Sequence, residues 1–168
     1  DSVYYAYFAP YSMERHGDLI AECLHHPDVR LKILGQTVDG RDLDCLSVGT
    51  GPTSLWVTGR QHPGETQASW WMEGFLSRLL DVTDAMVNRL LDKAVFYVVP
   101  NMNPDGSVRG HLRTNAVGTN LNREWLEPSM ERSPEVYLVR EKMFETGMDM
   151  FLDIHGDEAL PVNFLAGC

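Results

Sequence analysis

The sequence predicts an α/β protein, a three-layer sandwich around a mixed, largely parallel and twisted sheet. Apolar runs of strand length alternate along the chain with segments of helical periodicity, which is typical of a parallel sheet covered by helices on both faces. A hairpin signal in the first third of the chain adds an antiparallel pair at one side of that sheet. The 168 residues suffice for one domain with a substantial core.

The first elements are marked by caps and turn residues. A helix is expected over residues 12–25, with Ser12 as its N-cap and a proline just beyond its end. Two strand-like runs within residues 29–48 flank Asp39-Gly40, a dipeptide that favours a tight hairpin turn. The apolar run at 55–58 is expected to form a buried strand.

A long helix is expected to begin at Pro63 and to continue to about Leu80. Its apolar residues recur at helical spacing and predict one face packed in the core. That face comprises Ala68, Trp71, Met72, Phe75, Leu76 and Leu79. A short helix over residues 83–91 and an apolar strand over residues 94–99 follow.

The segment 101–125 is rich in Asn, Gly and Arg and has little apolar periodicity, so we expect a long functional loop. The next helix is expected over residues 133–146, with Ser133 as N-cap and Pro134 at the first helical position. Residues 150–154 and 161–165 read as two further strands.

Composition narrows the function classes. The formal net charge of −10 argues against nucleic acid or an acidic membrane surface as partner. No apolar run reaches membrane-spanning length. The three cysteines have no CxxC spacing or disulfide framework, which favours reduced thiols and a cytoplasmic location. No sequence signal indicates an oligomeric state.

Three residues of metal-ligand type follow strand-like runs. His62 and Glu65 are three residues apart in a segment that enters a helix, and His155 follows the strand at 150–154. Ligands of such sheets bind beyond the carboxyl ends of the strands, so we expect one shared site. Two imidazoles and one carboxylate are the ligand set of a catalytic zinc that keeps a position open for water. The pattern therefore predicts a hydrolase with one zinc ion.

Five ordered segments surround these ligands: Arg60–Thr66, Asn101–Gly106, Arg109–Asn115, Gly118–Trp125 and Asp153–Glu158. Together they closely resemble the zinc carboxypeptidase family, and specifically its cytosolic carboxypeptidase-like branch, over roughly residues 55–164. The resemblance implies that zinc-activated water hydrolyses the C-terminal peptide bond of peptides or protein tails. Because eukaryotic members of this branch trim glutamates from protein tails, deglutamylation is one activity that it implies.

The resemblance also implies roles for single residues. His62, Glu65 and His155 match the zinc ligands, and Arg113 matches the arginine that stabilises the oxyanion. Asn122 and Arg123 match the pair that grips the terminal carboxylate of the substrate.

Domain boundaries follow from the same resemblance. The chain starts at Asp1 and ends at Cys168, and both ends look cut. We expect residues 1–10 to be a linker or the end of an upstream β domain. Residues 11–168 would be the N-terminal part of the peptidase domain, truncated before its C-terminal part.

The sequence departs from the family pattern at three places. The general-base glutamate is expected downstream of Cys168, because Glu158 follows His155 too closely, so the fragment is not expected to be competent alone. Gly64 stands where digestive carboxypeptidases carry an arginine. Asn120 replaces an aspartate that contacts a zinc histidine, so the support of His62 is expected to differ. Asp153 is a candidate for such support, whereas Asp157 reads as an exposed loop carboxylate.

Two alternative functions stay open. A zinc amidohydrolase that deacylates N-acyl amino acids would share the ligand set and would also present a carboxylate to Arg123. A non-catalytic domain that binds peptide C-termini would need no general base.

Overall fold

The computed structural model describes residues 2–3, 5–160 and 162–167, and within them five strands form one sheet in the order β1-β2-β4-β3-β5. The strands are β1 (Arg30–Gln36), β2 (Asp42–Val48), β3 (Thr53–Gly59), β4 (Ala94–Val99) and β5 (Met150–Ile154). β3 pairs in parallel with β4 and β5, whereas β2 is antiparallel to both β1 and β4. All strands but β2 point the same way, which confirms the mixed, largely parallel sheet.

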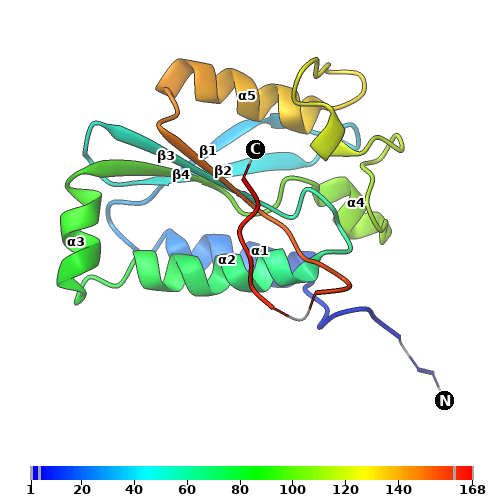
Figure 1. Cartoon of the computed structure of the whole chain (residues 1–168), viewed down its shortest axis with the longest axis horizontal. Helices are drawn as coiled ribbons and strands as arrows, with labels where there is room; N and C mark the ends of the chain where they lie inside the picture. Colours follow the sequence, from blue (N-terminus) through cyan, green and yellow to red (C-terminus); the bar gives the residue numbers. More distant parts are fainter. Residues whose placement is uncertain (1, 4, 161, 168) are drawn as a thin grey trace.

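Helices cover both faces of this sheet, as the fold class predicts. The helices are α1 (Met13–Cys23), α2 (Thr66–Leu79), α3 (Ala85–Leu91), α4 (Pro104–Arg109), the 3₁₀ turn η1 (Leu121–Arg123) and α5 (Pro134–Thr146). In Figure 1, α1 and α2 lie on one face and α5 lies on the other, while α4 sits at one end of the sheet. No helix in the described part of the chain is long and apolar enough to cross a membrane.

Two apolar clusters fill the layers between sheet and helices. The cluster under α1 and α2 includes Leu19, Ile20, Val57, Met72, Leu76, Phe96 and Val98. The cluster under α5 includes Leu43, Trp56, Val99, Met102, Leu121, Val136 and Val139. Because both faces of β3 are buried, the strand carries apolar residues on consecutive positions rather than in alternation.

Two predicted turn and cap signals are confirmed. The Ser12 side chain accepts a hydrogen bond from the Arg15 amide and caps α1, which ends at Cys23 rather than at His25. The hairpin turns at Asp39-Gly40, where Gly40 has φ of 76° and the Thr37 amide donates to the Arg41 carbonyl at 2.9 Å.

The helix predicted from Pro63 begins three residues later, at Thr66. The reason is a tertiary contact, because the Gly64 amide donates to the Leu112 carbonyl at 2.9 Å and holds the preceding residues in a turn. The prediction that Trp71 packs in the core is also wrong, because Trp71 is 41% exposed and stacks on Phe75.

The predicted loop at 101–125 contains two helical turns that we did not expect. Asn103 caps α4 by accepting from the Gly106 amide, Pro104 occupies the first position, and Gly110 ends the helix with φ of 74°. These are ordinary helix-boundary residues, but α4 is too short for its periodicity to show.

Two further expectations near the helix and chain ends need correction. Ser133 precedes α5 as predicted, but its hydroxyl contacts Glu124 instead of capping the helix. The strand predicted at 161–165 does not form over residues 162–165, which are exposed, while Pro161 lies outside the described residues. Residues 5–8 form no strand, which is compatible with the linker that is one of the two expectations for residues 1–10.

Candidate metal centre

The three predicted ligands meet at the carboxyl ends of two neighbouring parallel strands. His62 and Glu65 lie in the turn between β3 and α2, and His155 directly follows β5. One donor atom of each residue lies within 4.8 Å of the others, and this is the one such group among the described residues. The parallel pairing of β3 with β5 thus brings together residues that are 90 positions apart.

Glu65 is the centre of this arrangement. Its Oε1 lies 2.7 Å from Nδ1 of His62, and its Oε2 lies 2.9 Å from Nδ1 of His155. The Gly156 amide donates to Oε2 at 3.0 Å. Both imidazoles therefore turn the same nitrogen, Nδ1, toward one buried carboxylate.

The outer nitrogens of both rings are held as well. Nε2 of His62 lies 3.0 Å from Oδ1 of Asn120, an oxygen identified by its bond from the Asn122 amide at 3.1 Å. Nε2 of His155 lies 2.6 Å from Oδ2 of Asp153. A neutral imidazole has only one N–H, so the His155 ring, which has carboxylate oxygens at both nitrogens, carries two protons or gives one nitrogen to a metal. The donor set therefore fits a metal ion at the two Nδ1 atoms and Glu65.

The surroundings shift the pKa values of two ligands in opposite directions. Burial raises the pKa of Glu65, but hydrogen bonds from His155, His62 and the Gly156 amide outweigh burial and bring it to about 2. Burial lowers the pKa of His155, but hydrogen bonds with Asp153 and Glu65 outweigh it and raise the value to about 9. The pocket thus holds a negative carboxylate and stabilises positive charge next to it.

A strained residue sets up the turn that carries the ligands. Arg60 has φ of 56° at the end of β3 and is 4% exposed. Its guanidinium donates to the carbonyls of Pro63 and Tyr11 at 3.1 and 3.0 Å. Desolvation by burial lowers the pKa of Arg60 to about 10. These contacts hold residues 60–63 in the turn from which His62 reaches Glu65.

The structure brings the predicted Arg113 to this group and leaves Arg123 apart from it. Nη1 of Arg113 lies 3.4 Å from Oε1 of Glu65, and Nη2 lies 3.2 Å from Nε2 of His62. Asn122 and Arg123 belong to η1, and the exposed Arg123 guanidinium donates to the Asn122 carbonyl. The segment still adjoins the site, because the Asn122 amide bonds the same Asn120 oxygen that faces His62.

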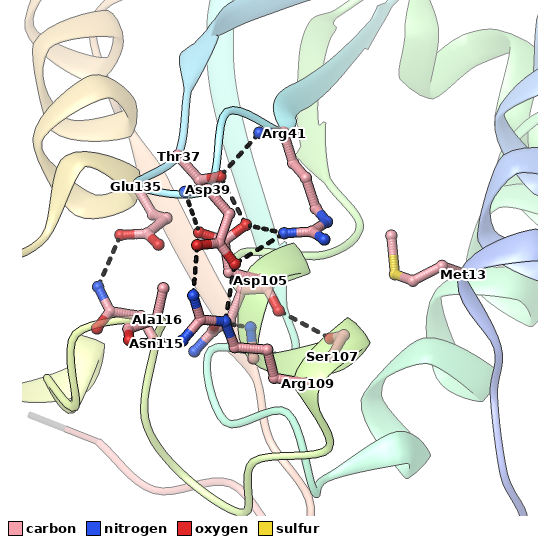
Figure 2. A network of polar contacts seen from close by, with 12 residues as sticks. Met13, Thr37, Asp39, Arg41, Asp105, Ser107, Arg109, Asn115, Ala116 and Glu135 are labelled. Atoms are coloured by element: carbon pink, nitrogen blue, oxygen red, sulfur yellow. Dashed lines mark hydrogen bonds and ion pairs between the residues drawn. The ribbon is translucent and has the colours of Figure 1, made fainter.

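A buried polar network anchors the loop that carries Arg113, and Figure 2 shows it. Asp105 is fully buried and accepts from Oγ1 of Thr37, the Asp39 amide and the Arg41 guanidinium, at 2.7 to 2.9 Å. Arg109 pairs with Asp39 in the same network. Through these contacts α4 and its following loop are tied to the β1–β2 hairpin.

The far side of the same network holds a second buried glutamate. Oε2 of Glu135 accepts from Nδ2 of Asn115 at 3.2 Å, and Oε1 has no hydrogen-bond partner among the described residues. Burial raises the pKa of Glu135 to about 7, and the charge of Asp105 acts in the same direction.

Sequence reasoning missed two residues behind His155. Gln61 is fully buried and its amide contacts Asp153, while the indole of Trp125 donates to Gln61 at 3.1 Å. Gln61 and Trp125 lie in two of the five segments that resemble the family. Neither side chain is a typical metal ligand, so the sequence offered no reason to place them at the site. The two aspartates behave as expected: Asp153 supports His155, and Asp157 is exposed and accepts from the amides of residues 159 and 160.

Comparisons with known proteins show what the chain is similar to. The family model described as zinc carboxypeptidase matches residues 19–160. The chain is 60% identical over 164 residues to an uncharacterized protein of Zymomonas mobilis, covering 98% of this chain and 43% of that protein. It is 30% identical over 192 residues to cytosolic carboxypeptidase 4 of Mus musculus, covering 100% of this chain and 17% of that protein.

Among solved structures, the fold is similar to a metallo-carboxypeptidase from Pseudomonas aeruginosa in complex with (2-guanidinoethylmercapto)succinic acid. The TM-score is 0.89 at 52% identity, and the match covers 92% of this chain and 42% of that one. The chain thus spans less than half the length of these relatives.

Proposed function

Because the chain belongs to the zinc carboxypeptidase family, we propose that it carries the metal centre of a zinc-dependent metallocarboxypeptidase. The observation that supports this proposal is the convergence of two imidazole Nδ1 atoms on the Glu65 carboxylate. We assign one zinc ion to His62, Glu65 and His155, since two histidines and one glutamate suit zinc. When bound, zinc would supply Lewis-acid chemistry that activates water and polarises the scissile carbonyl.

The neighbouring cations take the roles that the family resemblance implies. Arg113 is proposed to stabilise the oxyanion, and its position beside Glu65 and His62 supports that role. Asn122 and Arg123 are proposed to bind the terminal carboxylate of the substrate. The exposed guanidinium of Arg123 supports this, because its planar fork can bind a carboxylate with two hydrogen bonds.

The general base is proposed to come from the longer protein. Glu158 is exposed and makes no hydrogen bond to His62, Glu65 or His155 in the described structure. We further propose that residues 11–168 are part of the peptidase domain and that residues 1–10 lead into it from a preceding β domain.

The proposed substrate is the C-terminus of a peptide or protein, and removal of tail glutamates is one specific possibility. Similarity to a cytosolic carboxypeptidase supports a C-terminus as substrate, and the choice of glutamate rests on the resemblance to the cytosolic carboxypeptidase-like branch. The same similarity, with the free thiols of Cys23 and Cys45, supports a cytoplasmic location. The ligand of the Pseudomonas aeruginosa structure combines a guanidino group with succinic acid, so acidic and basic C-terminal residues should both be tested.

The test uses the full-length protein that contains this chain, loaded with zinc. A peptide library with varied C-terminal residues is incubated with and without a chelator, and the products are identified by mass. We expect loss of one C-terminal residue, abolished by the chelator and absent for peptides with an amidated C-terminus. The preferred residue then identifies the substrate class.

Two results would contradict the proposal. Cleavage of N-acyl amino acids without trimming of any free peptide would identify a deacylase. Binding of peptide C-termini with zinc verified and no product would identify a recognition domain. As an internal control, replacing Arg113 with Ala should leave the zinc content unchanged while turnover falls roughly 100- to 1,000-fold, the range for loss of one oxyanion donor.

A further inference from the structure

Both histidines of the metal centre are held from behind by one short segment of the chain, Asn120–Trp125. At its start, the Asn120 side chain meets Nε2 of His62. At its end, the indole of Trp125 reaches Gln61, whose amide contacts the aspartate that holds His155. The segment therefore contacts His62 directly and His155 through Gln61 and Asp153, although the two histidines follow different strands.

The path from Trp125 to His155 has a fixed direction. An indole N–H can only donate, so the Gln61 atom that it meets is the carbonyl oxygen Oε1. The Gln61 Nε2 group then has to face Asp153, and it does so at Oδ2. Gln61 cannot turn its amide over without losing both hydrogen bonds, and its side chain is fully buried.

Asp153 is fixed from both of its oxygens. Thr58 donates to Oδ1 at 2.8 Å, while Oδ2 receives the Gln61 amide and faces Nε2 of His155 at 2.6 Å. With its two oxygens fixed in this way, Asp153 presents Oδ2 as the acceptor for an N–H on Nε2 of His155. The lone pair of Nδ1 is thereby left for the metal, as in other metal sites in which a carboxylate orients a histidine.

We propose that Gln61 and Trp125 are positioning residues that set the orientation of His155 through Asp153. Asn120 contacts His62 directly, and Trp125 acts on His155 through Gln61 and Asp153. The segment Asn120–Trp125 therefore aligns both metal histidines. The inference rests on the proposed zinc site. It adds that metal affinity depends on an indole and an amide that contact no ligand atom.

The first experiment compares two tryptophan variants of the full-length protein. Trp125→Phe removes the donor to Gln61 while a phenyl ring can still pack on Phe151, whose ring centroid lies 5.4 Å from that of Trp125. The matched control is Trp56→Phe, which removes an indole N–H that donates to Thr146 and Gly147 instead. Zinc and cobalt dissociation constants are measured by competition with a chromophoric chelator, and the cobalt protein is examined by visible absorption.

We expect Trp125→Phe to weaken metal binding about 10-fold, within the range for lost outer hydrogen bonds of metal ligands, and to change the cobalt spectrum. Trp56→Phe should leave both unchanged. Equal metal affinity and spectrum in Trp125→Phe and wild type would overturn the proposal, and so would equal losses in both variants. If the wild type bound neither metal, the proposed zinc site would fail first and this inference with it.

A second variant tests whether Trp125 acts through Gln61. Gln61→Met keeps the side-chain length but removes both hydrogen bonds, so it should weaken metal binding at least as much as Trp125→Phe. The double variant should bind metal no more weakly than Gln61→Met alone, because the indole then has nothing to orient. Additive losses would show that Trp125 acts by another route and would refute the relay.

Discussion

Glu65 and Glu135 are both buried glutamates, at 5% and 0% exposure, yet their surroundings move their pKa values in opposite directions. Both oxygens of Glu65 face donors, and its pKa falls to about 2. Glu135 has one amide donor on one oxygen, and its pKa rises to about 7. Burial raises the pKa of both carboxyls, and hydrogen bonds outweigh that effect only at Glu65.

The difference separates a site from its scaffold. The Glu65 carboxylate is held negative at the point where two imidazoles converge, which suits it to a cation. Glu135 lies behind the loop that carries Arg113, where it joins Asn115 to the start of α5 and contacts none of the three proposed ligands. A search for buried acids alone would rank the two alike.

The largest expected contrast is in metal binding. Glu65→Gln should raise the zinc dissociation constant by more than the roughly 10- to 100-fold that loss of an outer hydrogen bond costs, since a ligand itself is removed. Glu135→Gln should leave it unchanged. Competition with a chelator measures both constants, and a large metal defect in Glu135→Gln would break the distinction between site and scaffold.

The next contrast is in the pH dependence of stability. A folded-state pKa of about 7 against an ordinary value of 4.5 means that the native state binds the Glu135 proton more tightly. Its contribution is fully present below pH 4.5 and is lost as the pH rises through 7, by roughly 3 kcal/mol in total. Glu135→Gln keeps an acceptor for Asn115 and should remove this loss.

Urea unfolding of the metal-free wild type and Glu135→Gln at pH 5 and pH 8 tests the prediction. Other groups titrate in both proteins, so only the difference between them matters. Relative to the wild type, the variant should be more stable at pH 8 than at pH 5. The same difference at both pH values would show that Glu135 is already ionised in the native state.

The smallest contrast concerns the two glycines beside the metal ligands. A Cβ on Gly64 would lie 2.9 Å from the Leu112 carbonyl oxygen, which the Gly64 amide itself binds. The three atoms nearest to a Cβ on Gly156 would all belong to the side-chain amide of Gln67, which can move. Gly64→Ala should cost about 1–3 kcal/mol of unfolding free energy, and Gly156→Ala about 0.5 kcal/mol or less.

Urea unfolding of the metal-free protein at one pH compares the two glycine variants. Equal losses would show that the turn before Glu65 is no more constrained than the end of β5. A loss of unfolding free energy confined to Gly64→Ala would show that the turn after β3, which carries His62 and Glu65, is the more constrained of the two segments.

Much of the fold follows from local signals. The strands at Ala94–Val99 and Met150–Ile154 have the predicted boundaries, because each is a short apolar run whose neighbours cannot continue it. The ligands were predictable for a similar reason, since strand ends direct residues to one edge of the sheet.

What the sequence could not reveal depends on contacts between distant segments. The late start of α2 is caused by Leu112, and the roles of Gln61 and Trp125 arise only when β5 lies beside β3. The opposite pKa shifts of Glu65 and Glu135 have the same origin. Each glutamate precedes or enters a helix, and only the assembled surroundings tell them apart.

The pairing of β5 with β3 also sets an order of assembly. His62 and Glu65 are neighbours in the chain, whereas Thr58 and Asp153, opposite each other in the register, are 95 residues apart. Closing so long a loop is entropically costly and slows folding. During synthesis, the turn after β3 leaves the ribosome long before its third ligand. A metal ion that arrives early meets two ligands, and tight binding has to wait for the last strand of the described sheet.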